Sequence, residues 1–407
     1  MAEDFPLRQI TPEEYDAYVR FVDRGFFEEV GDEDLERWRS LVDWHRFYAI
    51  TDPAGEYAAS AGAFEYTISL PHAEPVGCAG VTVVVVRPDV RRRGMLGRMM
   101  ARMLADAREH EEPFAALFAS EGGIYGRYGF GPAVPSVDLE IDRAHARPVA
   151  AGDPAAGRFV TAEELIVAAP ALHEAARRQR GGMVGRREVE WQAWLGLDTE
   201  RDRADGWTRR FHYLIPDRGY VVYRGKEDWT DRVSHARLKV EELVALDPRT
   251  HVDLWSFLAA QDLVATIEVP HRPPDDPLRH LVHDEARVRD RSNAPLWVRP
   301  VDLPAALTAR GYAVADRCVL EITDRSLPDN AGRWSLETGP DGAACERTDV
   351  APDVVLDISE LATVMLGGVR ATTLRDAGRL VESTAAACAR LDRMFHVDRL
   401  PMVTFEF

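Results

Sequence analysis

Cysteine is scarce in this chain of 407 residues, and its four cysteines are scattered: Cys78, Cys318, Cys345 and Cys388. No Cys-x-x-Cys pair and no Cys/His cluster is present, which argues against a disulfide framework and against a zinc site. Three of the twelve histidines lie between His271 and His283. Their proline-rich spacing fits no standard set of metal ligands and favours a surface loop, so the sequence predicts no metal site.

Long apolar runs are also lacking. No run is long enough to span a bilayer, and the first residues, MAEDFPLRQITPEEYD, are charged and have no apolar core of the kind that a secretion signal needs. We therefore expect a cytoplasmic protein without a membrane span.

Positive charge is in deficit, since the formal net charge is −18. This balance disfavours nucleic acid as a partner and suits a cationic substrate.

The length of the chain predicts two or three domains. Residues 144–157, AHARPVAAGDPAAG, have no hydrophobic period and mark a loop or linker. Helical and extended patterns alternate on both sides of it, which predicts a mixed α/β class. The alternating residues 136–142 are expected to close the first sheet. A strand over residues 263–269 is expected to end at Pro270, because proline cannot donate to a sheet ladder.

One stretch, Val81 to Gly97, carries the clearest chemical pattern, VTVVVVRPDVRRRGMLG. Its β-branched run predicts a buried strand that ends before Pro88. Apolar residues recur every three or four positions from Leu96 to Ala107, which predicts an amphipathic helix. The order is therefore strand, basic turn with a glycine, and helix N-terminus. Free N–H groups, the helix dipole and arginines together favour a pyrophosphate. Neither a Walker loop nor a GxGxxG fingerprint is present.

The same turn resembles the acyl-CoA loop of the GCN5-related N-acetyltransferases, whose pattern is Arg/Gln-x-x-Gly-x-Gly/Ala. Arg91 and Gly94 match this pattern, whereas Leu96 occupies its last position and Gly97 comes one residue late. The resemblance implies that acetyl-CoA is the co-substrate.

A second stretch is more specific. The buried strand predicted over residues 114–119 runs into SEGGIYGRYGFG, from Ser120 to Gly131. Together with the RRRG turn and the final residues TFEF, this stretch closely resembles the Eis-like acetyltransferases of actinobacteria, which acetylate amines of aminoglycosides. The resemblance covers most of the chain and is strongest near residues 80–135, 295–315 and 360–407.

The resemblance implies tandem GNAT domains followed by a sterol-carrier-like domain. On this basis residues 1–146 form the catalytic domain, residues 147–293 a second GNAT-like domain without its own active site, and residues 294–407 the sterol-carrier-like domain. It also implies a homohexamer built from two trimers. The substrate implied is a polycationic amine such as an aminoglycoside, acetylated at one or several positions.

The resemblance further implies roles for individual residues. Tyr125 would be the general acid that protonates the departing CoA thiolate; a phenol with a pKa of about 10 suits a thiolate with a pKa near 8.5. The residues implied to bind the cofactor are Val84, Val85, Val86, Arg91, Arg92, Arg93, Gly94, Met95, Leu96, Gly97, Ser120 and Glu121. Those implied to line the amine pocket are Phe26, Glu28, Trp38, Arg39, Val83 and Glu406. Glu28 and Val83 stand where the family can have Asp and Phe, which leaves the substrate list open.

The family's general base is the terminal carboxylate of the chain, which here belongs to Phe407. An α-carboxyl with a pKa near 3.5 is a weak base. Burial and a neighbouring acidic group would raise its pKa.

Blander interpretations stand beside these. Phe26 and Trp38 also suit core packing, and a terminal phenylalanine is most often a frayed or packed tail. The whole chain could instead be a lipid carrier or a CoA-binding sensor without catalysis, or could acetylate protein lysine or another small amine.

Overall fold

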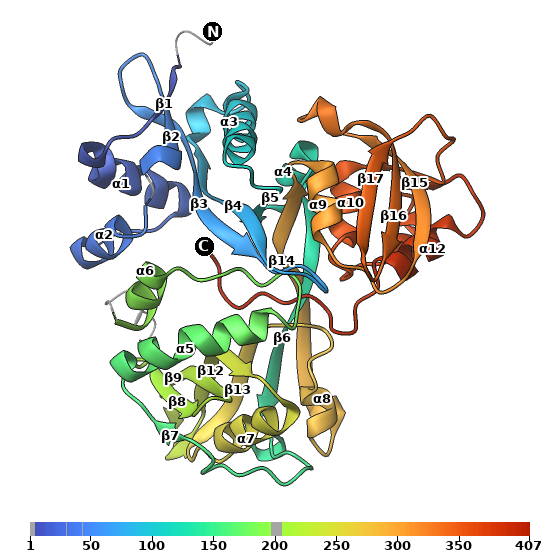
Figure 1. Cartoon of the computed structure of the whole chain (residues 1–407). Helices are drawn as coiled ribbons and strands as arrows, with labels where there is room; N and C mark the ends of the chain where they lie inside the picture. The colour runs from blue at the N-terminus through green and yellow to red at the C-terminus, as the bar shows by residue number, and fades with distance from the viewer. Residues whose placement is uncertain (1–4, 30, 43, 197–205) are drawn as a thin grey trace. The chain divides into compact units, whose positions relative to one another are not determined.

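The structure, a computed structural model, describes residues 5–29, 31–42, 44–196 and 206–407, which form two compact units (Figure 1). The first unit consists of Met1–Val134, Ala294–Pro401 and Glu406–Phe407. The second consists of Pro135–Asn293 and Met402–Phe405. The described ranges contain no helix with the length and apolar character needed to cross a bilayer.

The first unit contains a sheet with the strand order β1-β2-β3-β4-β5-β14. These strands are β1 (Leu7–Gln9), β2 (Phe47–Thr51), β3 (Tyr57–Ile68), β4 (Val76–Val86), β5 (Phe114–Phe118) and β14 (Val288–Pro300). The accompanying helices are α1 (Tyr15–Phe26), α2 (Asp32–Arg39), α3 (Met95–Glu109) and the short α4 (Gly122–Tyr125). The α3 helix follows the predicted period, and it buries Met99, Met103 and Leu104 in the core that it shares with β3 and β4.

The same unit contains a five-stranded sheet with the order β17-β16-β15-β18-β19. Its strands are β15 (Asp316–Thr323), β16 (Gly332–Gly339), β17 (Gly342–Arg347), β18 (Val354–Asp357) and β19 (Val381–Glu382). Its helices are α9 (Leu303–Ala309), α10 (Ile358–Val364), α11 (Ala371–Asp376) and α12 (Ala387–Met394). The α10 helix is buried along its whole length, including its polar residues Ser359, Glu360 and Thr363.

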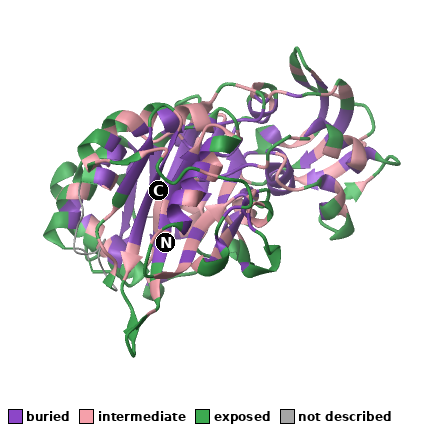
Figure 2. Cartoon of the chain, turned by 90° about the horizontal axis from the view of Figure 1, so that it is seen from below, coloured by how far each residue is buried: buried purple, intermediate pink, exposed green. Residues whose placement is uncertain are grey.

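The second unit contains the strand order β6-β13-β12-β9-β8-β7. These strands are β6 (Gly131–Asp142), β7 (Arg158–Phe159), β8 (Phe211–Ile215), β9 (Gly219–Lys226), β12 (Ala236–Ala245) and β13 (Val264–Arg272), with a separate hairpin of β10 (Trp229–Thr230) and β11 (Val233–Ser234). Its helices are α5 (Ala162–Arg177), α6 (Glu188–Trp191), α7 (Pro248–Ala259) and α8 (Leu278–Leu281). Buried residues run along the sheet strands in both units, and several helices expose one side (Figure 2).

Two expectations about strands are wrong. Residues 136–142 do not close the first sheet: Val137 to Asp142 pair with β13 in the second unit, and Leu296 to Pro300 of β14 pair with β5 in the first. Alternation predicts a strand but not its partner, which tertiary packing decides. The β13 strand also continues past Pro270 to Arg272. The register shifts between Val269 and Arg272, so the proline lies in a bulge, where no ladder hydrogen bond is required.

Candidate active site

The strands β4 and β5 separate in the middle of the first unit. They run parallel and pair only from Cys78 opposite Phe114 to Gly80 opposite Ala116. Beyond this point β4 continues to Val86, while β5 keeps its pairing with β14 as far as Phe118. Within the described ranges, no strand pairs with this edge of β4 after Gly80. A row of backbone N–H and C=O groups is therefore available to an extended ligand.

A bulge lies on the same part of β4. Val85 pairs with Ser60 and Thr82 with Gly62, so that Val83 and Val84 together face a single residue of β3. Val83 has a φ of 49°, in the left-handed region that a β-branched residue rarely adopts. The Ser60 hydroxyl donates a hydrogen bond of 2.7 Å to the Val83 carbonyl oxygen and holds this conformation. No local sequence pattern predicts this bulge, because it depends on how two separate strands align.

The basic turn, which we call the cofactor loop (residues 91–97), ends at the N-terminus of α3. Gly94 is the N-cap residue with a φ of 79°, and it supplies no side-chain cap. The first turn of a helix leaves N–H groups without intrahelical partners, and here the Arg98 N–H donates to the Gly94 oxygen at 3.1 Å. A Cβ atom added to Gly94 would meet nothing within 4 Å. The helix end is therefore open to an anion.

Three arginines surround this helix end, and all are exposed. Arg91 donates from Nε to the Val86 carbonyl oxygen at 3.3 Å, and the Arg93 guanidinium lies 5.5 Å from the centre of the Phe5 ring. Arg92 has a φ of 64° and forms no ion pair with any described residue. Its charge is available to a ligand. An uncapped helix terminus, open space and arginine charge fit a diphosphate-bearing cofactor such as CoA.

Tyr125 lies at the end of α4, just beyond β5. Its side chain is buried, with 7% of its surface exposed, and its ring makes an edge contact with Phe130 at 6.3 Å. Burial raises the pKa of the Tyr125 phenol, and the charge of Glu121 raises it further. The hydroxyl has no hydrogen-bond partner among the described residues. Ser120 and Glu121, which follow β5, are exposed.

Tyr128 is a second phenol near the cofactor loop. Its hydroxyl lies 3.9 Å from the place that a Cβ atom on Gly97 would take, over the first turn of α3. It is partly buried, and burial raises its pKa as well. The Tyr128 phenol therefore lies close to Gly97 of the cofactor loop. The family resemblance, in contrast, implies Tyr125 as the general acid.

Phe407, the last residue, is seated against the place where β4 and β5 separate. Its ring centre lies 4.8 Å from that of Tyr66 on β3 and 5.0 Å from that of Phe118 on β5. A Cβ atom on Gly80 would come within 3.0 Å of the Phe407 ring and would overlap Tyr66. Gly80 is the last residue of β4 that pairs with β5. A glycine inside a strand often marks such a close approach. Gly80 is therefore the feature of the sequence that could have indicated where the Phe407 ring packs.

The residues predicted to line an amine pocket are mostly exposed. The side chains of Phe26 and Trp38 are 45% and 36% exposed, respectively, so neither is the fully packed core residue of the blander interpretation. Phe26 ends α1 next to Gly25, where any Cβ atom would overlap Val85 of β4. This contact places the end of α1 beside the bulge that contains Val83. Glu28 and Glu406 are also exposed.

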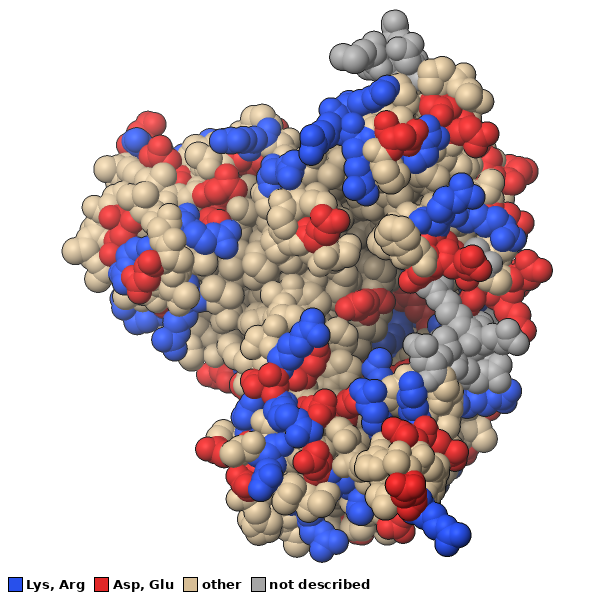
Figure 3. All heavy atoms as spheres, turned by 180° about the vertical axis from the view of Figure 1, so that it is seen from behind, with Lys and Arg blue, Asp and Glu red and all other residues tan. Residues whose placement is uncertain are grey.

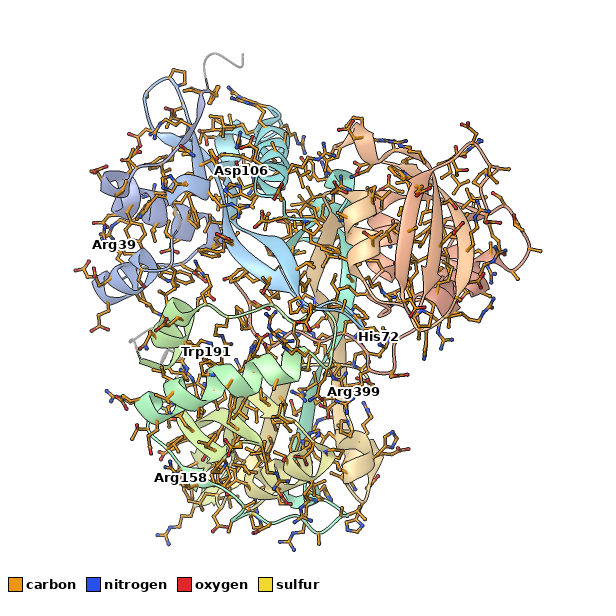
Figure 4. All side chains as sticks on the ribbon, viewed as in Figure 1. Arg39, His72, Asp106, Arg158, Trp191 and Arg399 are labelled. Carbon is orange, nitrogen blue, oxygen red and sulfur yellow. The ribbon has the colours of Figure 1, made fainter. Side chains whose placement is uncertain are left out.

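Arg39 differs from the other residues predicted for the pocket. It lies at the end of α2, where it is labelled in Figure 4, and its guanidinium donates to Asp16 at 2.6 Å. The guanidinium carbon also lies 4.5 Å from the centre of the Tyr15 ring. Its charge is therefore already paired.

On the face drawn in Figure 3, acidic and basic side chains are interspersed and do not gather into one charged field.

The second unit repeats the strand, helix and parallel strand arrangement with β12, α7 and β13. Here the helix end is closed. Asp247 is the N-cap of α7, and its carboxylate accepts hydrogen bonds from the N–H and the hydroxyl of Thr250 at 2.8 and 2.6 Å. Burial acts to raise the pKa of Asp247, but the bonds from Thr250 and the charge of Arg218 outweigh it, and the pKa falls to about 2. A carboxylate thus occupies the position that a phosphate would need.

Comparisons with known proteins agree with this arrangement. Residues 6–133 and residues 182–300 each match a model described as an acetyltransferase (GNAT) domain. Residues 303–404 match a model described as a sterol carrier protein domain. The fold is therefore that of tandem GNAT domains followed by a sterol carrier domain, and the class of protein is an N-acetyltransferase.

The relatives define the family more narrowly. N-acetyltransferase Eis of Mycobacterium tuberculosis is 35% identical over 396 residues, which cover 94% of each chain. An uncharacterized N-acetyltransferase, SCO2625, of Streptomyces coelicolor is 36% identical over 385 residues, 92% of each chain. The crystal structure of Eis1 from Mycobacterium abscessus superposes with a TM-score of 0.87 at 29% identity, covering 99% of this chain and 100% of that one. The chain belongs to the Eis family of GCN5-related N-acetyltransferases and is an acyltransferase.

Proposed function

We propose that this protein transfers the acetyl group of acetyl-CoA to primary amines of a polycationic substrate such as an aminoglycoside, with Tyr125 as general acid and the terminal carboxylate of Phe407 as general base. The observation that carries the proposal is the seat of Phe407 at the point where β4 and β5 separate. The same point is where an acyl chain that follows the free edge of β4 would arrive.

Each step of the reaction needs a group that these residues supply. Acetyl-CoA provides an acetyl thioester, whose carbonyl carbon the amine attacks. A primary amine is protonated at neutral pH, so the carboxylate of Phe407 takes a proton, directly or through water, to free the lone pair. When the carbon–sulfur bond breaks, the Tyr125 hydroxyl gives its proton to the thiolate. The attack leaves one surplus proton on the nitrogen, which is released to solvent as the carbon–sulfur bond breaks. The products are an acetamide and CoA, Tyr125 regains a proton from solvent, and the Phe407 carboxyl gives its proton up to solvent.

Binding of the cofactor is assigned to the free edge of β4 and to the cofactor loop. The backbone of Val84 to Val86 would pair with the pantetheine arm, and the N–H groups at the start of α3, with Arg92, would hold the diphosphate. Ser120 and Glu121 would contact the cofactor beyond the end of β5.

The amine pocket is assigned to exposed aromatic rings and carboxylates, which suit a cation with several charges. Phe26 and Trp38 supply the rings, and Glu28 and Glu406 supply negative charge. Val83 is assigned to the same pocket, because the bulge that contains it lies beside the end of α1. Because Arg39 is paired with Asp16, we assign it to the wall of the pocket and not to direct binding of a cation.

Acetyl-CoA and an aminoglycoside, mixed with the purified protein, test the proposal through release of free CoA thiol. We expect release to depend on both substrates and the antibiotic to gain the mass of one or more acetyl groups. Thiol release that does not depend on the amine, with no acetylated product, would contradict it.

The proposal extends to the organisation of the protein. We propose domains at residues 1–146, 147–293 and 294–407, and a cytoplasmic homohexamer of two trimers, as the family resemblance implies. Sedimentation equilibrium of the purified chain tests the oligomer.

A further inference from the structure

The segment that carries Tyr125, residues 122–131, is open on one side and closely packed on the other. We call this segment the Tyr125 turn. A Cβ atom added to Gly126 would meet nothing within 4 Å, whereas one added to Gly129 or Gly131 would overlap other atoms. Gly129 also has a φ of 85°, in the left-handed region that glycine favours. The turn therefore presents backbone without side chains to the elements on its packed side.

Those elements are β14 and α10. A Cβ atom on Gly129 would overlap the guanidinium of Arg299, near the end of β14. A Cβ atom on Gly131 would overlap the carbonyl oxygen of Ser359 and the side chain of Thr363, both on α10. The part of the turn that follows α4 is in contact with α10 (Figure 1). All these residues belong to the first unit.

The Arg299 guanidinium is buried and is held from the side away from the turn. Its side chain is 0% exposed, and Nη2 donates a hydrogen bond of 2.6 Å to the carboxylate of Asp324, which is 1% exposed. The same carboxylate accepts from the backbone N–H groups of Ser326 and Leu327 at 3.1 and 2.9 Å, and from the Asn330 side chain at 3.1 Å. Residues outside the Tyr125 turn therefore fix where the guanidinium lies.

Two other groups of this guanidinium are unpaired. Arg299 Nε and Nη1 are buried and have no hydrogen-bond partner among the described residues. Buried polar groups are nearly always paired, because an unpaired one costs stability. An apolar side chain of similar length would fill the space without that cost. Nη1 is the atom that lies against Gly129, so the unpaired part of the side chain is the part that supports the turn.

The contact at Gly129 reaches Tyr125 through the backbone. The Gly129 N–H donates to the Gly126 carbonyl oxygen at 2.9 Å, and the Phe130 N–H donates to the Tyr125 carbonyl oxygen at 3.4 Å. The Phe130 ring also makes the edge contact with the Tyr125 ring. A displacement of Gly129 would therefore be passed to Tyr125 within one short loop of chain.

We propose that Arg299 is a positioning residue for Tyr125, because together with α10 of the sterol carrier domain it supports the Tyr125 turn and so fixes where the phenol lies. This inference rests on the proposed role of Tyr125 as general acid. Proton transfer requires precise placement, and a misplacement of about 1 Å can cost on the order of 10²-fold in rate. The sterol carrier domain thereby contributes to catalysis without binding either substrate.

Arg299→Lys tests the contact while it keeps a positive charge beside Asp324. Lysine has a compact ammonium group in place of the planar fork, so the group that lies against the turn is lost. The matched control is Arg46→Lys, because Arg46 is 1% exposed in the same unit and pairs with the buried carboxylate of Glu112 at 2.6 Å. Hydrogen exchange with mass spectrometry follows the amides of the Tyr125 turn without substrate. The constants kcat and KM are measured with acetyl-CoA and an aminoglycoside.

We expect the amides of the Tyr125 turn to exchange roughly tenfold faster in Arg299→Lys than in the wild type, because a buried contact that opposes local opening is lost. The kcat should fall roughly tenfold or more, with an unchanged KM for acetyl-CoA. In a Tyr125→Phe background the same substitution should lower kcat by no more than about twofold, because the group that it positions is already absent. Arg46→Lys should match the wild type in both measurements.

A second pair of variants probes the same contact from the turn, in case Arg299→Lys does not fold. Gly129→Ala presses a methyl group on the guanidinium, and Gly126→Ala, which places a methyl group in open space in the same turn, is its control. Gly129→Ala should exchange faster and lose kcat as Arg299→Lys does, whereas Gly126→Ala should match the wild type. Thermal melting checks that each variant is folded.

Three results overturn the proposal. If the turn exchanges in Arg299→Lys as slowly as in the wild type, Arg299 does not hold it. If exchange is faster but kcat is unchanged, holding the turn does not position a reacting group. If Arg299→Lys lowers kcat by the same factor with and without the Tyr125 hydroxyl, it acts through another group.

Tyr125→Phe alone tests the proposed acid. If its kcat equals that of the wild type, the proposed role of Tyr125 fails, and a role of Arg299 in the reaction fails with it. The exchange rates, which need no substrate, still decide separately whether Arg299 holds the turn.

Discussion

The ring of Phe407 meets the ring of Phe118 edge to face, with ring centres 5.0 Å apart. Residue 407 is the end of the chain, and Phe118 is the last residue of β5, just beyond the point where β4 and β5 separate. This contact places the ring of Phe407 beside the point where the two strands separate, and the proposed reaction depends on that position.

The cofactor loop gives the first prediction. Arg92→Ala removes a charge that no described carboxylate pairs, and charge-assisted contacts to phosphate are strong. We expect KM for acetyl-CoA to rise roughly tenfold, with a smaller change in kcat. The control is Arg393→Ala, which removes an exposed arginine from α12 and should change neither constant. If calorimetry finds the same affinity for acetyl-CoA in Arg92→Ala as in the wild type, the cofactor loop does not bind the diphosphate through Arg92.

Tyr125 gives the second prediction. Tyr125→Phe keeps the ring and its packing on Phe130 but removes the proton, so kcat should fall on the order of 10²–10⁴-fold while the protein folds normally. A variant that keeps the wild-type kcat would remove Tyr125 from the mechanism. Tyr128, which lies over the first turn of α3, would then be the next candidate.

The same residue predicts a pH dependence. Burial raises the pKa of the Tyr125 phenol above its usual value of 10. The acid form is therefore present at all pH values below that raised pKa and is lost only as the pH rises through it. We expect no loss of kcat attributable to this group below about pH 10. An alkaline limb near pH 8 that disappears in Tyr125→Phe would contradict this assignment.

Gly80 gives a structural prediction. A methyl group at this position would overlap the Tyr66 ring and press on Phe407. Gly80→Ala should lower stability by about 1–3 kcal/mol, as overpacking does, and should lower kcat by displacing the tail. Gly77→Ala in the same strand is the matched control, since its methyl group would only touch Glu112 at 3.4 Å. Equal kcat values for the two variants would argue against a seat at Gly80.

The sequence predicted the parts of the site that local patterns encode. The β-branched run and the apolar period placed β4, the cofactor loop and α3, because strand and helix periods are properties of neighbouring residues. The stretch from Ser120 to Gly131 placed Tyr125 after β5 in the same way. The tandem GNAT fold and the sterol carrier fold came from family resemblance and are confirmed by the family models.

What the sequence could not predict depends on residues far apart in the chain. The bulge at Val83 arises from the alignment of β4 with β3, and the seat of Phe407 joins three strands. The prediction that residues 136–142 close the first sheet was wrong for the same reason, since β6 pairs with the distant β13. The cap at Asp247 was readable in principle, since Asp247 precedes Pro248 and Thr250 at the start of a helix.

The central claim is that the terminal carboxylate of Phe407 is the general base, and its most direct test is to move that carboxylate. A few residues added after Phe407 replace it with an amide, which cannot take a proton, and an N-terminal extension of equal length is the control. We measure kcat for amine acetylation and affinity for acetyl-CoA in both proteins. The C-terminally extended protein should bind acetyl-CoA normally but lose turnover on the order of 10²–10⁴-fold, while the control keeps it. If both extended proteins acetylate the amine equally fast, Phe407 is only a packed tail, and the base lies among Glu28, Glu121 and Glu406.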